Sequence, residues 1–289
     1  MSDYWTALIA GIVEGLTEFL PVSSTAHIVL TQKILSVDLT SSFWKMFTVV
    51  IQLGAILSVV VYFWKRLTAF VLSFPLPRKQ SVHSSDAITA EPAASIWKHP
   101  LTLVVISFVV TAIPCFLMDR FIADQLESPL AIALALIIGG IVMVIVDRVC
   151  SPRATTMRME DMTLTQAIAI GLTQILSATF PGTSRSMATI AGGQVMGLSR
   201  PAALEFSFFL SIPVMFAAAG FKLVQFVLEE PVTIEADQWI TLAIGFITSF
   251  VVALGVIAWF MQWVKSRGFV PFAIYRIFLG IIVLVWLYR

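Results

Sequence analysis

The chain has 289 residues, of which 58% are hydrophobic and only 12% are charged, and its mean hydropathy is +0.94. Soluble domains carry about 25% charged residues, so this composition excludes a soluble globular protein and predicts an all-α polytopic membrane protein. The formal net charge of +1 gives no reason to expect a nucleic-acid partner. The two cysteines, Cys115 and Cys150, form neither a metal-binding motif nor a disulfide framework.

Taken in chain order, the apolar stretches are of two kinds. Six are long enough to form transmembrane helices, which need about 20 residues each. These six are residues 42–64, 100–118, 129–147, 203–223, 239–263 and 271–288. The other two regions, 4–35 and 164–198, are interrupted near the middle by proline and hydroxyl residues, which leaves pieces too short to span a bilayer. Each is predicted to be a re-entrant helix–loop–helix hairpin that enters and leaves the membrane on one side.

Residues 67–99 are expected to form a cytoplasmic loop, because much of this segment is rich in proline, serine and charge. The remaining sequence has no other connection of comparable length between predicted spans.

The two interrupted regions resemble each other at a constant offset of 160 residues. ALIAGIVEGLTEFLPVSSTAH, residues 7–27, aligns with AIAIGLTQILSATFPGTSRSM, residues 167–187. The matched pairs include Gly11 with Gly171, Pro21 with Pro181, Ser24 with Ser184, and Glu14 with Gln174.

Each interrupted region is followed by three predicted spans, which gives two repeats, at about 4–149 and 164–289, in a single membrane domain of residues 1–289. Because three is an odd number, the second repeat is inverted, and the two hairpin tips can meet near the membrane midplane, as in many transporters. Eleven Lys and Arg residues fall on the side opposite the N-terminus and five on the N-terminal side. The positive-inside rule then predicts that both termini and the entrance of the first hairpin are outside the cytoplasm.

Two carboxylates of the first hairpin, Glu14 and Glu18, are four residues apart and therefore share one face of a helix. Such a pair suits a divalent cation, which would offset the cost of two charges inside a membrane. The alternative is that both carboxylates lie at the membrane surface and are solvated. The apolar residues directly before Glu14 favour the buried position.

Three hydroxyl residues, Ser23, Ser24 and Thr25, follow the break that Pro21 imposes on the helix. They stand where a new helix begins, and such residues often serve only as N-caps. The free N–H groups of a helix start also bind anions, and a hydroxyl with His27 three residues later is typical of a nucleophile with a general base. A histidine in an apolar segment can equally be a core residue with satisfied hydrogen bonds, and the spacing does not decide between these roles.

The second hairpin contains PGTSRS, residues 181–186, and supplies a positive charge. Its glycine and hydroxyl residues at a helix start offer donors to phosphate oxygens, and its arginine has the planar fork that binds phosphate bidentately. An arginine that reaches to the membrane surface is the alternative, but the apolar residues after the motif favour a deeper position. The candidate phosphate ligands are Gly182, Thr183, Ser184, Arg185 and Ser186, and Gln52, in the middle of the first span, is expected to line the same site.

Together the two hairpin tips would bring acids, hydroxyls, a histidine and an arginine to one place. Phosphoryl transfer depends on positioning and charge neutralisation, which these groups can provide. Because the site would lie inside the membrane, the expected substrate is a lipid phosphate. Two other charged residues, Glu205 and Arg276, lie at similar depth in different spans and are predicted to form a structural ion pair.

The two hairpin motifs, EGLTEFLPVSSTAH and PGTSRS, resemble those of the bacterial undecaprenyl-diphosphatase family, also called the bacitracin-resistance protein family. VIQLGAILSVVVYFW (50–64) and FAIYRIFLGI (272–281) extend the resemblance, which covers the whole chain. It implies hydrolysis of undecaprenyl diphosphate to the monophosphate and inorganic phosphate, which recycles the carrier lipid for cell-wall synthesis and confers bacitracin resistance. It also implies a divalent cation, Mg²⁺ or Ca²⁺, and an active site that opens to the periplasm from the bacterial inner membrane. The oligomeric state stays open, with a homodimer as one option.

The resemblance also implies roles for individual residues. The matching positions are Glu14 and Glu18 for metal binding and acid–base work, Ser24 for the proposed nucleophile with Ser23 beside it, His27 for the histidine, and Ser184 with Arg185 for phosphate binding. Attack by serine and direct attack by metal-bound water use the same residues, and both remain open. The family usually has glycine at the positions of Ala26 and Met187, so the tightness of the two tips is in question.

The main alternative function is a lipid flippase or secondary transporter, because inverted repeats with hairpins at the midplane are transporter architecture. A transporter needs no nucleophile, so metal-dependent release of phosphate distinguishes the two. A phosphatidate-phosphatase-like enzyme would need a second histidine after the arginine, and the second half of the chain has none. A purely structural role does not explain several ionisable residues at the hairpin tips.

Overall fold

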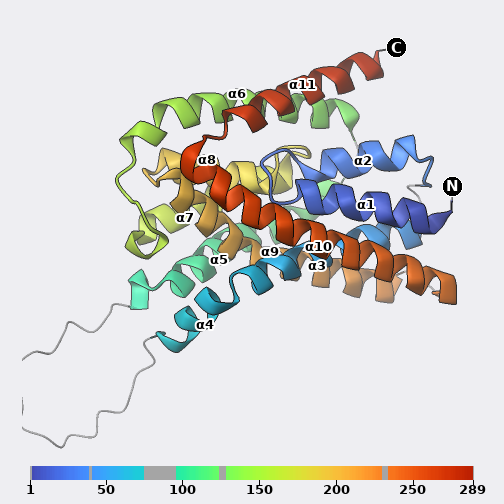
Figure 1. The fold of residues 1–289 in the computed structure, drawn as a ribbon, viewed down its shortest axis with the longest axis horizontal. Coiled ribbons are helices and arrows are strands. Elements are labelled where there is room, and N and C mark those ends of the chain that lie inside the picture. The colour runs from blue at the N-terminus through green and yellow to red at the C-terminus, as the bar shows by residue number, and fades with distance from the viewer. Residues whose placement is uncertain (1, 39–40, 75–95, 124–127, 230–233, 289) are drawn as a thin grey trace, which may run out of the picture.

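The computed structural model describes residues 2–38, 41–74, 96–123, 128–229 and 234–288, and within these ranges the chain is helical and forms no β-strand. Six helices in this described part are long and apolar enough to cross a membrane. They are α3 (Ser42–Tyr62), α5 (Pro100–Ala123), α6 (Pro129–Val149), α9 (Arg200–Glu229), α10 (Ala236–Ser266) and α11 (Val270–Leu287). All six lie at the predicted spans, which confirms the all-α membrane fold (Figure 1).

Four shorter helices come from the two interrupted regions. α1 (Asp3–Thr17) and α2 (Ser24–Ile34) form the first pair, and α7 (Leu164–Thr179) and α8 (Arg185–Val195) form the second. Each pair is separated by a short non-helical break that contains a proline, because the residue before a proline avoids the helical conformation. The predicted helix–break–helix form is confirmed for both regions, and their re-entry into the membrane remains a prediction. Three 3₁₀ helices complete the described elements: η1 (Ile96–Lys98), η2 (Ser151–Arg153) and η3 (Met159–Asp161).

One further helix, α4 (Trp64–Leu72), occupies part of the region that we predicted to be a loop. The prediction that the loop begins at residue 67 is therefore wrong, because the helix continues to Leu72. No proline or glycine interrupts this stretch, and Phe70 packs on Phe209 of α9 with 5.5 Å between ring centroids, which holds the helix against the bundle. Residues 75–95 lie outside the described part of the chain.

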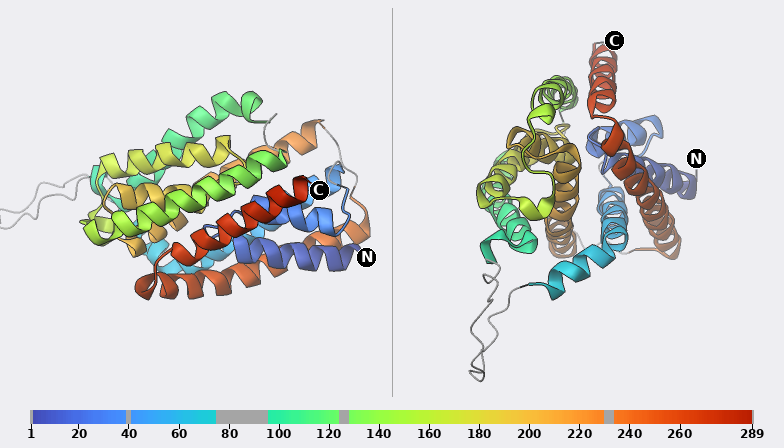
Figure 2. Two further views of the ribbon diagram at one scale, coloured as in Figure 1. Left: turned by 90° about the horizontal axis from the view of Figure 1, so that it is seen from above. Right: turned by 60° about the vertical axis from the view of Figure 1, so that its left-hand side comes forward.

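The helices of the two halves pack in corresponding pairs. α1 lies along α10, and α7 lies along α5, so the first helix of each interrupted region packs on the second long span of the other half. Helices that hold the same place in the two halves also lie side by side: α3 with α9, and α6 with α11 (Figures 1 and 2). α1 begins and α11 ends at the same end of the bundle (Figure 1). This exchange of partners is what two repeats related by a two-fold axis would produce.

Small residues bring the exchanged helices into close contact. A Cβ atom added to Gly11 of α1 would lie 2.7 Å from the carbonyl oxygen of Gly245 in α10. A Cβ atom added to Gly171 of α7 would lie 2.7 Å from the carbonyl oxygen of Ser107 in α5. Glycines at these two positions therefore let the backbones approach, which is how helices associate inside a membrane.

A buried carboxylate joins four elements at the end of the bundle where α6 ends and α9 begins. Asp147 of α6 is 1% exposed and pairs with Arg200, the first residue of α9, with 2.7 Å between Oδ1 and Nε. It also accepts hydrogen bonds from the side chain of Gln194 in α8 and from the backbone N–H of Phe269, which precedes α11. Sequence reasoning did not identify this cluster, because its members are far apart in the chain.

The predicted ion pair between Glu205 and Arg276 is wrong. Glu205 pairs with Arg66 of α4, with 2.5 Å between Oε1 and Nε, and Arg66 also contacts Glu160 at 2.9 Å. Equal depth along two helices does not fix the direction in which each side chain points, and Arg276 points toward the two breaks.

Candidate active site

Each break ends in a serine with an unusual backbone conformation. Ser23 has φ of 73° and Ser184 has φ of 71°, a region that residues other than glycine rarely adopt. Both serines are N-caps: the Ser23 hydroxyl accepts a hydrogen bond from the N–H of Ala26, and the Ser184 hydroxyl accepts one from the N–H of Met187. The two breaks thus direct the chain into the next helix in the same way.

These caps change the correspondence between the repeats. The constant offset of 160 residues matched Ser24 with Ser184, but the shared capping role pairs Ser23 with Ser184. The cap Ser184 lies three positions after Pro181, whereas the cap Ser23 lies two positions after Pro21, so Ser24 corresponds to Arg185, and each is the first residue of its helix. Ala26 and Met187, the two positions where the resemblance implies glycine, also correspond to each other.

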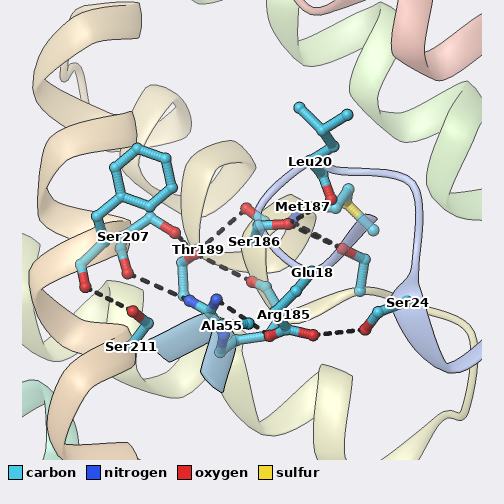
Figure 3. A network of polar contacts seen from close by, with 12 residues as sticks. Glu18, Leu20, Ser24, Ala55, Arg185, Ser186, Met187, Thr189, Ser207 and Ser211 are labelled. Carbon is cyan, nitrogen blue, oxygen red and sulfur yellow. Dashed lines mark hydrogen bonds and ion pairs between the residues drawn. The ribbon is translucent and has the colours of Figure 1, made fainter. Parts of the chain in front are cut away.

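Ser24 and Arg185 meet at one carboxylate (Figure 3). The hydroxyl of Ser24 donates a hydrogen bond to Oε2 of Glu18 at 2.5 Å. Nη2 of Arg185 lies 3.5 Å from Oε1 of the same carboxylate, and both side chains of this pair are largely buried. Equivalent positions of the two helix starts therefore carry a hydroxyl and a guanidinium to opposite oxygens of Glu18.

Arg185 is held in place by its surroundings. Nη1 donates to the backbone carbonyl of Ser207 in α9 at 3.2 Å, and the guanidinium lies 6.0 Å from the ring centroid of Phe19. A positive charge over an aromatic face is favourable. The guanidinium is thus held near Glu18 at the start of α8.

Ser186 connects the two breaks instead of facing the cavity. Its hydroxyl donates to the carbonyl oxygen of Leu20 in the first break at 2.9 Å (Figure 3). The same hydroxyl lies 3.0 Å from the hydroxyl of Ser184. It is 1% exposed, so it joins the tips rather than offering a free donor to a ligand.

A cavity of about 610 Å³ opens beside the contact of Ser24 and Arg185 with Glu18. The predicted site residues that line it are Glu18, Ser23, Ser24, Thr25, Gln52, Gly182, Ser184 and Arg185. The predicted site residues that do not line it are Glu14, His27, Thr183 and Ser186. The structure therefore brings both predicted motifs to one cavity.

His27 does not point at Ser24. Its Nδ1 lies 2.7 Å from the carbonyl oxygen of Ser23, and its Nε2 lies 2.7 Å from the hydroxyl of Tyr275 in α11. Because a carbonyl can only accept, Nδ1 carries the proton, and in the neutral ring Nε2 accepts from the tyrosine hydroxyl. The group placed to take the proton of Ser24 is Glu18.

Glu14 of α1 and Glu18, the C-cap of the same helix, have the oxygen ligands that suit a hard divalent cation. Glu14 is 3% exposed and lies one turn before Glu18, which is 7% exposed and faces the cavity. The described residues contain no cluster of three or more His, Cys, Asp or Glu side chains that could enclose a metal ion. One or two carboxylates, completed by water and substrate phosphate, are the usual way in which Mg²⁺ is held.

Sequence reasoning missed several polar residues of the cavity. Gln174 of α7 is 1% exposed, lines the cavity and donates to the hydroxyl of Thr111 in α5 at 3.1 Å. Its alignment with Glu14 was a signal that could have identified it. Lys222 and Gln225 of α9 also line the cavity, and a lysine within the apolar run FKLVQF was the corresponding signal.

The fold and the cavity define a class: helical membrane proteins with a cavity at which two helix starts, a guanidinium and a carboxylate meet. A family model described as "Bacitracin resistance protein BacA" matches residues 7–282, and the chain belongs to this family. Similar proteins include an "Undecaprenyl-diphosphatase" of Koribacter versatilis, which is 52% identical over an alignment of 294 positions that covers 99% of each chain.

Two more distant relatives carry the same name. The protein of Enterococcus faecalis is 39% identical over 96% of this chain and 94% of its own length. The protein of Aquifex aeolicus is 38% identical over 96% of each chain.

Proposed function

We propose that this protein hydrolyses undecaprenyl diphosphate to undecaprenyl phosphate and inorganic phosphate. The single observation that carries the proposal is the contact of Ser24 and Arg185 with the two oxygens of Glu18 at one cavity. The names of the relatives supply the substrate. Release of the monophosphate recycles the carrier lipid for cell-wall synthesis and lowers the amount of diphosphate available to bacitracin.

In the proposed reaction, Ser24 Oγ attacks the terminal phosphorus of the diphosphate. Its proton passes to Oε2 of Glu18, which already accepts a hydrogen bond from this hydroxyl. The bond between the terminal phosphorus and the bridging oxygen breaks, and undecaprenyl phosphate leaves with the proton that Glu18 passes to that oxygen, so Glu18 is again a carboxylate. Water then attacks the phosphoserine, giving inorganic phosphate and restoring the hydroxyl, with Glu18 as the base.

The phosphate is held by charge and by the two helix starts. Arg185 lies at the N-terminus of α8, where free N–H groups and the helix dipole favour an anion. Its planar fork can pair with two phosphate oxygens and offset the charge that develops during transfer. Thr25, Gln52 and Gly182 line the same cavity and complete the proposed phosphate site.

A divalent cation, Mg²⁺ or Ca²⁺, is proposed at Glu14 and Glu18. When bound, it would polarise the phosphate oxygens and neutralise charge. The support is that Glu14, in α1, and Glu18, at the end of that helix, are one helical turn apart and offer only oxygen ligands. Removal of divalent cations with a chelator should therefore abolish turnover, and addition of Mg²⁺ should restore it.

The apolar part of the cavity suits the lipid chain. Its wall comes mainly from α5 and α9, including Phe108, Ala112, Val214 and Met215. The pair of helices that the repeat relates to them, α10 and α3, packs much more closely. The two related helix pairs therefore differ in packing, because a cavity lies between α5 and α9. A polyprenyl chain can lie in that cavity while its diphosphate reaches Glu18.

We also propose that both termini and the cavity entrance lie on the periplasmic side of the bacterial inner membrane. The support is the excess of Lys and Arg on the opposite side. A cysteine introduced at residue 2 should react with a membrane-impermeant reagent in intact spheroplasts. Reaction only after the membrane is opened would contradict this orientation.

The alternative is a flippase or secondary transporter, which the exchanged packing of the two halves would also suit. Purified protein with undecaprenyl diphosphate in detergent separates the two, because detergent leaves no second compartment. The proposal expects release of inorganic phosphate that depends on a divalent cation and on Glu18. Absence of release, under conditions in which a relative is active, would contradict it.

A further inference from the structure

Arg276 of α11 is a buried cation outside the predicted catalytic set. It is fully buried, at 0% exposed, and it is among the largest fully buried side chains of the described residues. None of the ion pairs in the described part of the chain includes it. A buried guanidinium without a carboxylate is costly unless its N–H groups find acceptors, so its actual partners identify its role.

Those partners are backbone carbonyls of both breaks. Nη1 donates to the carbonyl oxygen of Pro21 at 3.1 Å, and Nη2 donates to that of Gly182 at 3.1 Å. Nη2 also donates to the carbonyl oxygen of Ala135 in α6 at 3.2 Å. One planar side chain therefore ties the first break, the second break and a long span together.

The two carbonyls occupy equivalent places in the repeats. Pro21 stands two residues before the cap Ser23, and Gly182 stands two residues before the cap Ser184. Each cap has a positive φ that is stable only when surrounding contacts hold it. The residue after each cap, Ser24 or Arg185, is the one that contacts Glu18. The bridge made by Arg276 thus fixes the two backbone segments that set the distance between nucleophile and phosphate ligand.

We propose that Arg276 is a positioning residue that holds the two breaks in register, so that Ser24 and Arg185 reach the same phosphate. It does not touch the substrate and acts through the Pro21 and Gly182 carbonyls. This inference rests on the proposed function, because it concerns the same reaction. It expects loss of the guanidinium bridge to lower kcat far more than it changes KM, since misplacement by a fraction of an ångström slows an oriented reaction.

A glycine of α6 gives a test that leaves Arg276 in the chain. A Cβ atom at Gly139 would lie 2.5 Å from Nη2 of Arg276 and 2.8 Å from Cε of Met187, so Gly139→Ala pushes the guanidinium and the flexible end of the methionine. A Cβ atom at Gly255 of α10 would meet no atom within 4 Å, so Gly255→Ala is the control. Each variant adds one methyl group to a long helix of the bundle.

The measurement is phosphate release from undecaprenyl diphosphate by the purified variants, normalised to folded protein. We expect Gly139→Ala to lower kcat by about tenfold or more with KM within about twofold, and Gly255→Ala to keep kcat within about twofold of the wild type. Arg276→Lys, which keeps the charge but not the fork, should lower kcat by about 100-fold. In an Arg185→Lys background, the added loss from Gly139→Ala should shrink, because both changes then act on one alignment.

Equal losses in the two alanine variants, or multiplicative losses in the double variant, would overturn the inference. If Arg276→Lys does not fold, the alanine pair decides alone, because both of its members retain every polar group. Wild-type turnover is measured first: its absence would contradict the proposed function, whereas normal turnover in both the wild type and Gly139→Ala would contradict only the role of Arg276.

Discussion

Glu18 accepts a hydrogen bond from Ser24 on one oxygen and lies against Arg185 on the other. Its carboxylate can therefore receive a proton from the hydroxyl, and the guanidinium that we propose to bind phosphate lies beside it. His27, which the spacing suggested as a base, is instead held by the carbonyl of Ser23 and the hydroxyl of Tyr275. At the scale of single residues, the proposed chemistry depends on a carboxylate that contacts the first residues of two helices.

Replacement of Arg185 by lysine tests this arrangement. The variant keeps a positive charge but loses the planar fork, so kcat/KM should fall by about 100-fold, or roughly 3 kcal/mol of transition-state stabilisation. Arg267→Lys is the matched control, because that guanidinium stacks on Trp263 and lies outside the cavity. Steady-state phosphate release measures both, and full activity in Arg185→Lys would show that the fork has no role.

At the scale of elements, the cavity between α5 and α9 distinguishes this pair of helices from the pair that the repeat relates to it, α10 and α3. The corresponding helices α3 and α10 are drawn together at Gly54, where an added Cβ atom would lie 2.5 Å from the carbonyl oxygen of Phe246. α5 and α9 instead enclose apolar cavity wall with a polar end at Glu18. One cavity with two kinds of lining suits a ligand with a charged head and an apolar chain.

A tryptophan in this wall should therefore affect long lipids most. Ala112→Trp fills the gap from α5 and should lower kcat/KM for undecaprenyl diphosphate by about tenfold or more, with a smaller effect on farnesyl diphosphate. Ile113→Trp is the control, because Ile113 is 56% exposed on the outer face of the same helix. Equal losses for the long and the short substrate would contradict a chain site between α5 and α9.

At the scale of the whole molecule, Asp147 joins the ends of α6 and α9 to the second hairpin and to the start of α11. The ion pair of Asp147 with Arg200 does not line the cavity, but it connects helices that contribute residues to the cavity or pack beside it. We therefore attribute to it the relative placement of the helices, and not the chemistry.

Removal of the Asp147 carboxylate should destabilise the protein strongly. Asp147→Ala leaves Arg200 without its buried partner, which costs about 3 kcal/mol or more and should lower Tm by several degrees. Arg158→Ala breaks the exposed pair with Asp161 and should have almost no effect. Thermal unfolding in detergent, followed by tryptophan fluorescence, measures both, and equal Tm values for Asp147→Ala and the wild type would contradict the role.

The long spans could be predicted from sequence because each is a continuous apolar run, and the breaks could be predicted because proline interrupts such a run. The convergence of Ser24 and Arg185 followed from the repeat, although the extra residue between Pro181 and the cap Ser184 shifted the match by one position. The partners of Glu205, His27 and Arg276 could not be predicted in the same way. They depend on the rotation of each helix about its axis, which is set by packing with distant segments.

The most direct test of the central claim is to trap the covalent intermediate. The protein would be mixed with undecaprenyl diphosphate labelled at the terminal phosphorus, quenched in acid within one turnover, and digested for mass spectrometry. The account predicts labelled phosphate on Ser24, with none on Ser23 or Thr25 and no labelled protein in Ser24→Ala. Wild-type turnover by Ser24→Ala, with no labelled serine in either protein, would contradict it.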